Sequence, residues 1–131
     1  MRIIDIHTHI YPDKIAARAV AGTGEFYDFT AACDGTAAGL LADGAAAGID
    51  HFIVQSVATT PKQVNSINEF IAGAVAQSGG KFTGLGTLHP ESDDIAADLR
   101  HLQSLGLKGV KFHPDYQRFD ADDPKMKPIY R

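Results

Sequence analysis

Residues 3–12 of the chain read IIDIHTHIYP, a run in which most side chains alternate between apolar and polar. This alternation predicts a β-strand over residues 3–10, because successive side chains of a strand point to opposite faces. One face is expected to carry Ile3, Asp5, His7 and His9. The other is expected to be apolar and to pack under helices, and it carries Ile4, Ile6, Thr8 and Ile10. The two histidines stand at the carboxyl end of the strand, where parallel α/β folds place their ligands.

Three more runs of branched and aromatic residues predict strands, and they cover residues 51–58, 82–88 and 107–113. Apolar side chains recur at helical spacing in the two segments between these strands, residues 61–80 and 93–105, and each pattern stops at glycine. A third helix is expected over residues 36–48, before the second strand, although its glycines weaken it. Residues 122–130 are expected to form a loop that enters one more helix.

Strands that alternate with helices predict an α/β fold with parallel strands and right-handed crossovers. Two architectures of this class fit the order of elements, an open doubly wound sheet and a (β/α)8 barrel. The length of 131 residues favours the open sheet, since a complete barrel needs roughly 250 residues. The first strand, however, ends in histidines and lacks the glycine-rich turn that binds phosphate in many open sheets.

The first candidate site is the histidine pair. Imidazoles two residues apart on one strand can bind a common divalent ion, with each nitrogen at about 2.0 to 2.1 Å if the ion is zinc. His7 and His9 are therefore candidate metal ligands. The alternative, that they are ordinary surface or core histidines, is weakened by their position at a strand end.

The fourth predicted strand repeats this pattern, because Lys111 and His113 share one of its faces. Lys111 is a candidate partner for a substrate carboxylate or a carbamate bridge between two metals, and its structural alternative is an ion pair with an acid such as Asp5. His113 is a candidate pocket residue. His89, after the third strand, and Arg118 are weaker candidates for substrate binding. His51, His101 and Cys33 are expected to have no catalytic role.

The composition narrows the range of partners. The chain has 12 basic and 16 acidic side chains and one cysteine. A net charge of −4 without a basic stripe argues against nucleic acid and anionic membranes as partners. No run reaches the ~18 apolar residues that span a bilayer. We therefore expect a cytoplasmic protein that acts on a small molecule.

The three ordered motifs DIHTHIYP, GLGTLHPES and GLKGVKFHPD resemble the amidohydrolase-related family of metal-dependent hydrolases. More narrowly, the chain looks like the branch that contains aminocarboxymuconate-semialdehyde and resorcylate decarboxylases beside uncharacterised hydrolases. This resemblance implies a TIM barrel with a divalent metal ion, commonly zinc, at the carboxyl-terminal mouth of the strands. It also implies that His7 and His9 are metal ligands and that His113 faces the pocket. The implied reaction is metal-assisted hydrolysis of an amide, lactone or ester, or a non-oxidative decarboxylation.

The resemblance implies that residues 1–131 form a single N-terminal part of such a barrel, about the first four β/α units. The family's further metal ligands, a histidine after strand five and an aspartate after strand eight, have no counterpart in this sequence. These positions would follow Arg131, so no residue of the chain is assigned as catalytic. A half-barrel would leave unpaired strand edges. We therefore expect a homo-oligomer, or pairing with the missing half-barrel.

Two other functions are compatible with the sequence. Metal-dependent nucleases and phosphoesterases also begin with H-x-H on a first strand, but the glutamate that they place at a later strand end is missing here. A catalytically incomplete fragment or a binding-only subunit would keep the two histidines without turnover. Activity of the chain without an added partner would exclude this last function.

Overall fold

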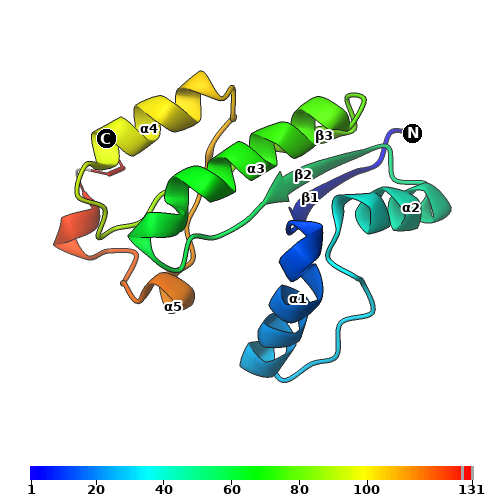
Figure 1. Cartoon of the computed structure of the whole chain (residues 1–131), viewed down its shortest axis with the longest axis horizontal. Coiled ribbons are helices and arrows are strands. Elements are labelled where there is room, and N and C mark those ends of the chain that lie inside the picture. The colour runs from blue at the N-terminus through cyan, green and yellow to red at the C-terminus, as the bar shows by residue number, and fades with distance from the viewer. Residues whose placement is uncertain (128, 131) are drawn as a thin grey trace.

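The computed structural model describes residues 1–127 and 129–130. The elements, in chain order, are β1 (Ile4–His9), α1 (Asp13–Tyr27), α2 (Ala37–Ala47), β2 (His51–Gln55), η1 (Pro61–Gln63), α3 (Val64–Gln77), β3 (Phe82–Gly84), β4 (Gly86–Thr87), α4 (Ile95–Ser104), β5 (Val110–Lys111), α5 (Pro114–Gln117) and η2 (Pro124–Met126). Figure 1 shows their arrangement.

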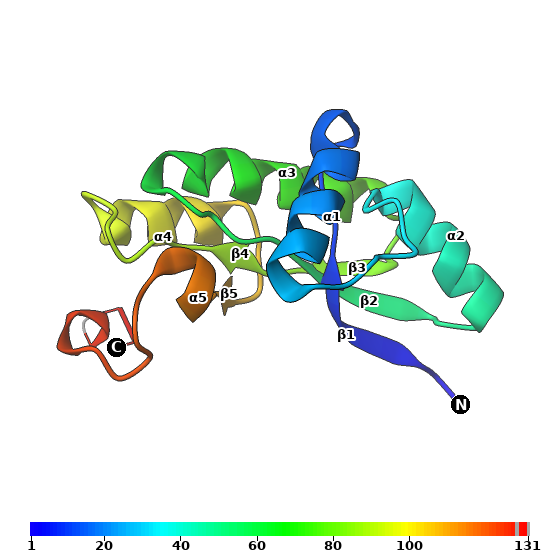
Figure 2. The same ribbon diagram turned by 90° about the horizontal axis from the view of Figure 1, so that it is seen from below.

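All strand pairs in the described part of the chain are parallel. β2 lies between β1 and β3 in one sheet, and β4 pairs with β5 in a second. The helix α3 connects β2 to β3, and α4 connects β4 to β5. Figure 2 shows α3 and α4 on the same side of the strands. The predicted α/β class with helical crossovers between parallel strands is confirmed.

The third predicted strand, residues 82–88, is divided at Leu85 into β3 and β4. The backbone nevertheless keeps partners on both sides, because the Leu85 N–H donates to the Val54 carbonyl and the Gly86 N–H to the Gly109 carbonyl, each at 2.9 Å. The segment therefore joins the two small sheets into one curved layer. The fourth strand is also shorter than predicted, since only Val110 and Lys111 pair with β4.

The helix α1 was not predicted from the sequence. Its first turn contains Asp13, and it ends at Asp28, which adopts a left-handed conformation with φ of 54°. Only Ala16 and Gly24 are buried in its 15 residues, and larger apolar side chains such as Ile15 and Phe26 are exposed. Figure 1 shows α1 projecting away from the strands after β1. The other three predicted helices are present as α2, α3 and α4.

The strand β1 is irregular in its middle. Asp5 pairs with Phe52 and Thr8 with Val54, so three steps along β1 match two along β2. A local hydrogen bond accompanies this irregularity, since the Asp5 carboxylate accepts from the His7 N–H at 3.1 Å. The bulge lies between Asp5 and Thr8 and therefore contains His7, the first histidine of the pair.

The prediction that the apolar face of β1 is covered by helices is only partly correct. Thr8 and Ile10 are buried, but Ile4 is 47% and Ile6 is 71% exposed. β1 lies at the edge of its sheet, and the described residues leave Ile4 and Ile6 open to solvent.

The core lies between the strands and helices α3 and α4. Phe52 and Val54 of β2 are buried against Ile71 of α3 and Leu102 of α4. The predicted helix ends are confirmed at Gly48 and Gly106, which adopt φ of 73° and 76°. These values suit glycine, which lacks a Cβ atom.

The segment after β5 contains α5 and the 3-10 turn η2. The helix expected to begin in residues 122–130 is represented only by η2, and residue 128 lies outside the described residues. Arg131, after which the further metal ligands were expected, also lies outside the described residues. None of the helices in the described ranges has the length and apolar character that crossing a membrane requires.

Candidate active site

A cavity of about 590 Å³ opens at the carboxyl ends of the strands. His7 and His9 at the end of β1 line it, together with Lys111 of β5 and His113 just after this strand. The helix α1 closes another side with Tyr27, its last residue. The fold thus brings together four of the six candidate site residues, from segments about a hundred positions apart.

The side chains of His7 and His9 converge. Their Nε2 atoms lie 3.1 Å apart, so the two rings are on the same face of β1, as the alternation predicts. Two nitrogens bound to one zinc ion at 2.0 to 2.1 Å would be separated by about 3.3 Å at a tetrahedral angle. The spacing of the two nitrogens therefore fits a shared metal ion.

The environment of His9 favours the neutral imidazole. Burial lowers the pKa of His9 from 6.5 to about 4, and the nearby His7 and Lys111 act in the same direction. A metal ion binds only the neutral imidazole. At neutral pH the His9 ring is therefore ready to bind an ion without first losing a proton.

The pair would be an incomplete ligand set by itself. Among the described residues, no three or more histidine, cysteine, aspartate or glutamate side chains come together as a metal site. Catalytic zinc sites have three protein ligands as a rule. Two imidazoles therefore account for part of such a site.

His113 is held on both sides of its ring. Its Nδ1 accepts from the backbone N–H of Tyr116 at 3.4 Å and caps the short helix α5, while its Nε2 lies 2.7 Å from the Tyr27 hydroxyl. The rings of His113 and Tyr116 stack with centroids 4.4 Å apart. Burial and the charge of Lys111 lower the pKa of His113.

The backbone of His113 is fixed by Gln117, which is buried. The Gln117 side-chain oxygen accepts from the His113 N–H at 2.9 Å, and its amide donates to the carbonyls of Ala58 and Leu88 at 2.9 and 2.7 Å. One side chain thus ties together the segments that follow β2, β4 and β5.

The other two candidates lie outside this cavity. His89 is 3% exposed, and its Nδ1 accepts from the Glu91 N–H at 3.2 Å within the loop after β4. Arg118 is exposed on a separate surface beside Asp115 and Asp120. Neither lines the cavity that holds the histidine pair.

Sequence reasoning missed the aromatic residues of the site. Phe26, Tyr27 and Tyr116 form a cluster of edge-to-face and tilted rings at the mouth of the cavity. Two of them belong to α1, which was not predicted. The only signal in the sequence is that Phe26 and Tyr27 are adjacent aromatic residues. This signal does not indicate which residues they contact.

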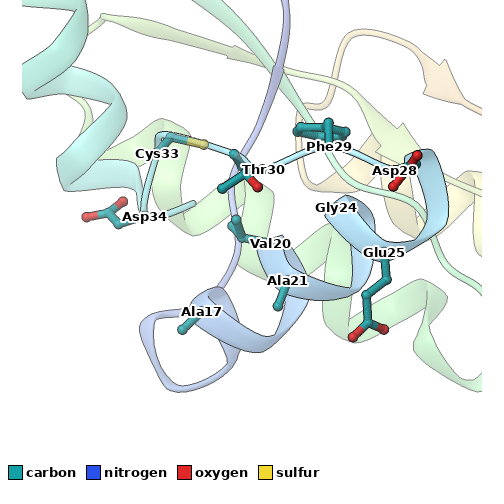
Figure 3. A pocket seen from close by; sticks show the side chains of 11 residues that line it. Ala17, Val20, Ala21, Gly24, Glu25, Asp28, Phe29, Thr30, Cys33 and Asp34 are labelled. Atoms are coloured by element: carbon teal, nitrogen blue, oxygen red, sulfur yellow. The ribbon is translucent and has the colours of Figure 1, made fainter.

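A second cavity, of about 760 Å³, lies between α1 and the loop that follows it. Figure 3 shows Cys33 and Asp34 on that loop and Ala17 and Val20 on the helix, with the Asp34 carboxylate directed away from the helix. The Asp34 carboxylate already accepts from the backbone N–H and the hydroxyl of Thr36, at 2.7 and 2.9 Å. This cavity contains no histidine or lysine in its described lining, and we assign it no chemistry.

The sequence of the chain matches the model of one protein family. The family model described as "Amidohydrolase" matches residues 4–131, nearly the whole chain. The chain belongs to the amidohydrolase family. The predicted family resemblance is thereby confirmed.

Solved structures agree with the fold of this amidohydrolase chain. It matches the 5-carboxyvanillate decarboxylase LigW of Sphingomonas paucimobilis with a TM-score of 0.71 and 17% identity, over 98% of this chain and 48% of that one. A 2,6-dihydroxybenzoate decarboxylase complexed with 2,6-dihydroxybenzoate matches with a TM-score of 0.62 and 18% identity, over 99% and 47%. A probable 2-pyrone-4,6-dicarboxylic acid hydrolase of Acinetobacter baumannii with citric acid bound matches with a TM-score of 0.52 and 17% identity, over 91% and 44%.

The chain therefore spans about half the length of these structures. Its parallel β/α units correspond to half of a TIM barrel, as predicted, and the open doubly wound sheet is excluded. Because the identities are below 25%, these structures establish the fold and not the substrate.

Proposed function

We propose that this chain contributes the metal ligands of the first strand to a metal-dependent amidohydrolase site. This site acts on a small carbonyl or carboxylate substrate. The observation that carries the proposal is the 3.1 Å approach of the His7 and His9 Nε2 atoms in a cavity that also contains Lys111. The position of this cavity at the carboxyl ends of parallel strands is where barrel enzymes place their active sites.

The proposed cofactor is a divalent metal ion, and zinc is the first candidate because its preferred ligands include imidazole nitrogen. His7 and His9 would hold it. When bound, such an ion acts as a Lewis acid toward a carbonyl or carboxylate oxygen.

The remaining roles fall to residues of the same cavity. Lys111 supplies a positive charge that attracts an anionic substrate and orients its carboxylate. His113, held by Gln117 and Tyr27, presents a neutral imidazole at the edge of the cavity. His89 and Arg118 face other surroundings, so we give them no part in binding the substrate.

Two histidines leave room for further ligands. We propose that these come from a second copy of the chain or from the complementary half of the barrel. We place the protein in the cytoplasm, since its single cysteine requires no oxidising compartment. Hydrolysis and decarboxylation are the two candidate reactions, and the solved structures that share this fold include two decarboxylases and one probable hydrolase.

The first test is the metal content of the purified chain, measured by elemental analysis. Three proteins are compared: the unmodified chain, the His7→Ala/His9→Ala double variant and His101→Ala, which removes a histidine of α4 that faces Glu69. We expect about one zinc per site in the unmodified chain and in His101→Ala, and none in the double variant. Retention of the metal by the double variant, or its absence from all three, would overturn the proposed site.

The second test separates the two reactions. Zinc-loaded protein is incubated with 2,6-dihydroxybenzoate, and the released carbon dioxide is measured. In a separate reaction the protein is incubated with a small aromatic lactone, and the released acid is measured. Turnover of one substrate that is lost in the double variant identifies the reaction. Metal binding without turnover of either would favour the binding-only alternative.

A further inference from the structure

Tyr27 and His113 meet across the mouth of the cavity. The Tyr27 hydroxyl, at the end of α1, lies 2.7 Å from Nε2 of His113, although the residues are 86 positions apart. Both residues line the cavity that holds His7, His9 and Lys111. A hydrogen bond this short must have a defined donor, and the surroundings of His113 determine which group it is.

The Nδ1 atom of His113 accepts a hydrogen bond from the Tyr116 backbone N–H. A nitrogen that accepts carries no proton, and a neutral imidazole carries only one. Burial, together with the charge of Lys111, lowers the pKa of His113, so the ring is neutral at neutral pH. The proton is therefore on Nε2, and Nε2 donates to the Tyr27 oxygen.

The direction of this bond decides what Tyr27 can do. Because its oxygen accepts from His113, the Tyr27 hydroxyl hydrogen must point elsewhere. Desolvation and the nearby Tyr116 and Asp115 raise the pKa of Tyr27, so the hydroxyl keeps its hydrogen at neutral pH. In the described part of the chain, His113 is the sole hydrogen-bonding partner of this hydroxyl. Tyr27 is also 47% exposed and lines the cavity, which places this residue beside a ligand that enters it.

We propose that Tyr27 is a substrate-binding residue whose hydroxyl donates a hydrogen bond to an anionic oxygen of the substrate, and that His113 is the positioning residue that orients it. Lys111 would then supply the charge for the same anionic group, and Tyr27 would supply the directed donor. This assignment rests on the proposed function, because it takes the cavity to be the substrate site.

The competing explanation is that the Tyr27–His113 bond only fastens α1 to α5. Removal of the hydroxyl would then loosen the cavity and weaken every ligand to the same extent. A donor to an anionic oxygen behaves differently, since hydrogen bonds to charged groups are roughly twice as strong as those to neutral groups. Two probes of the same shape and different charge can distinguish these explanations.

The experiment measures the dissociation constants of 2,6-dihydroxybenzoate and of its neutral amide by calorimetry, with and without a chelator. The unmodified chain is compared with Tyr27→Phe and with Tyr130→Phe, which removes a hydroxyl that donates to Ala121 outside the cavity. Tyr27→Phe should weaken the binding of the anion about tenfold and the binding of the amide about threefold or less. Tyr130→Phe should change neither.

A second measurement does not require a ligand. Nitrogen-15 NMR of the unmodified chain should show His113 protonated on Nε2, with Nδ1 unprotonated. Protonation on Nδ1, equal weakening of both probes in Tyr27→Phe, or failure of the unmodified chain to bind the anion would each overturn the assignment.

The failure of the proposed function gives a different result. If the chain holds no zinc but the anion-specific loss in Tyr27→Phe persists in the chelator, the metal site is wrong and the role of Tyr27 stands. If zinc binds as proposed and Tyr27→Phe binds both probes as tightly as the unmodified chain, the metal site stands and the role of Tyr27 is wrong.

Discussion

The side chain of Gln117 donates to the Leu88 carbonyl at 2.7 Å, although Leu88 follows a different strand of the sheet. The same amide group donates to the Ala58 carbonyl at 2.9 Å, and its oxygen accepts from the His113 N–H. Because Gln117 is 4% exposed, these groups have little access to water. Gln117 therefore replaces the strand pairing that the short β5 lacks at this end of the layer.

We predict that Gln117→Leu destabilises the chain by about 3 kcal/mol, because it leaves three backbone groups without partners in a buried position. Urea unfolding followed by circular dichroism measures this loss. The matched control is Gln103→Leu on the exposed side of α4, which should change the free energy of unfolding by about 0.5 kcal/mol or less. Equal effects of the two substitutions would show that the Gln117 network contributes nothing to stability.

Two glycines, Gly44 in α2 and Gly73 in α3, give a second prediction, about the packing of these helices. A Cβ atom on Gly44 would overlap the ring of Phe52, which lies in the core. Gly44→Ala should therefore destabilise the chain by roughly 1 to 3 kcal/mol, the usual cost of overpacking. Gly73 lies inside α3 with open space where its Cβ atom would be.

Gly73→Ala should instead stabilise the chain by up to about 1 kcal/mol, since alanine favours the helix and has fewer unfolded conformations. Thermal unfolding of both variants measures the difference. A stabilising Gly44→Ala would mean that α2 does not pack on Phe52 as described.

The sequence predicts those elements whose residues signal their own structure. The alternation around Asp5, His7 and His9 indicates a strand with two histidines on one face, and their Nε2 atoms do converge. The helices α2 and α4 also end before glycines as predicted, and Thr36 and Asp94 cap their first turns. α4 begins at Ile95, two residues after the start of the predicted segment. Each of these signals is local in the chain.

The features that the sequence does not predict depend on long-range contacts or on exposed surfaces. α1 buries only two residues, and it was not predicted although apolar residues such as Ile15, Ala19 and Phe26 recur in it at helical spacing. The contact between Tyr27 and His113 joins residues 86 positions apart, which no local pattern encodes. The division of the third strand at Leu85 arises from the neighbours on each side, Val54 and Gly109.

The neutral state of His113 leads to a third prediction. Desolvation, followed by the charge of Lys111, lowers the pKa of His113 below its usual 6.5. Between the folded and the unfolded pKa of His113, the unfolded chain binds a proton that the folded chain does not. The free energy of unfolding therefore rises with pH in this window. The contribution is complete above pH 6.5 and is lost as the pH falls toward the folded pKa.

Proton NMR of the His113 ring should therefore give a titration midpoint below 6.5 in the metal-free chain. Lys111→Met should move this midpoint upward, since it removes the second-largest cause of the shift. A midpoint at or above 6.5 in the unmodified chain would contradict both the burial of the ring and the proton position inferred for it.

The bulge in β1 gives a fourth prediction, in which a residue outside the proposed ligand pair controls metal binding. The Asp5 carboxylate accepts from the His7 N–H at 3.1 Å and keeps this group out of the regular pairing with β2. Asp5→Ala removes that acceptor, so His7 returns toward regular strand geometry and its ring turns away from His9. Loss of a residue that orients a ligand typically weakens metal binding by about 10 to 100-fold.

Asp5→Asn is the control, because its side-chain oxygen can accept the same hydrogen bond without the negative charge. Zinc affinity, measured by competition with a coloured chelator, should fall at least about tenfold in Asp5→Ala and by less than about threefold in Asp5→Asn. If both variants lose affinity equally, the charge of Asp5 matters and its hydrogen bond to His7 does not. If neither does, the direction of the His7 ring is independent of the bulge, and the strand itself is sufficient to pair the two histidines.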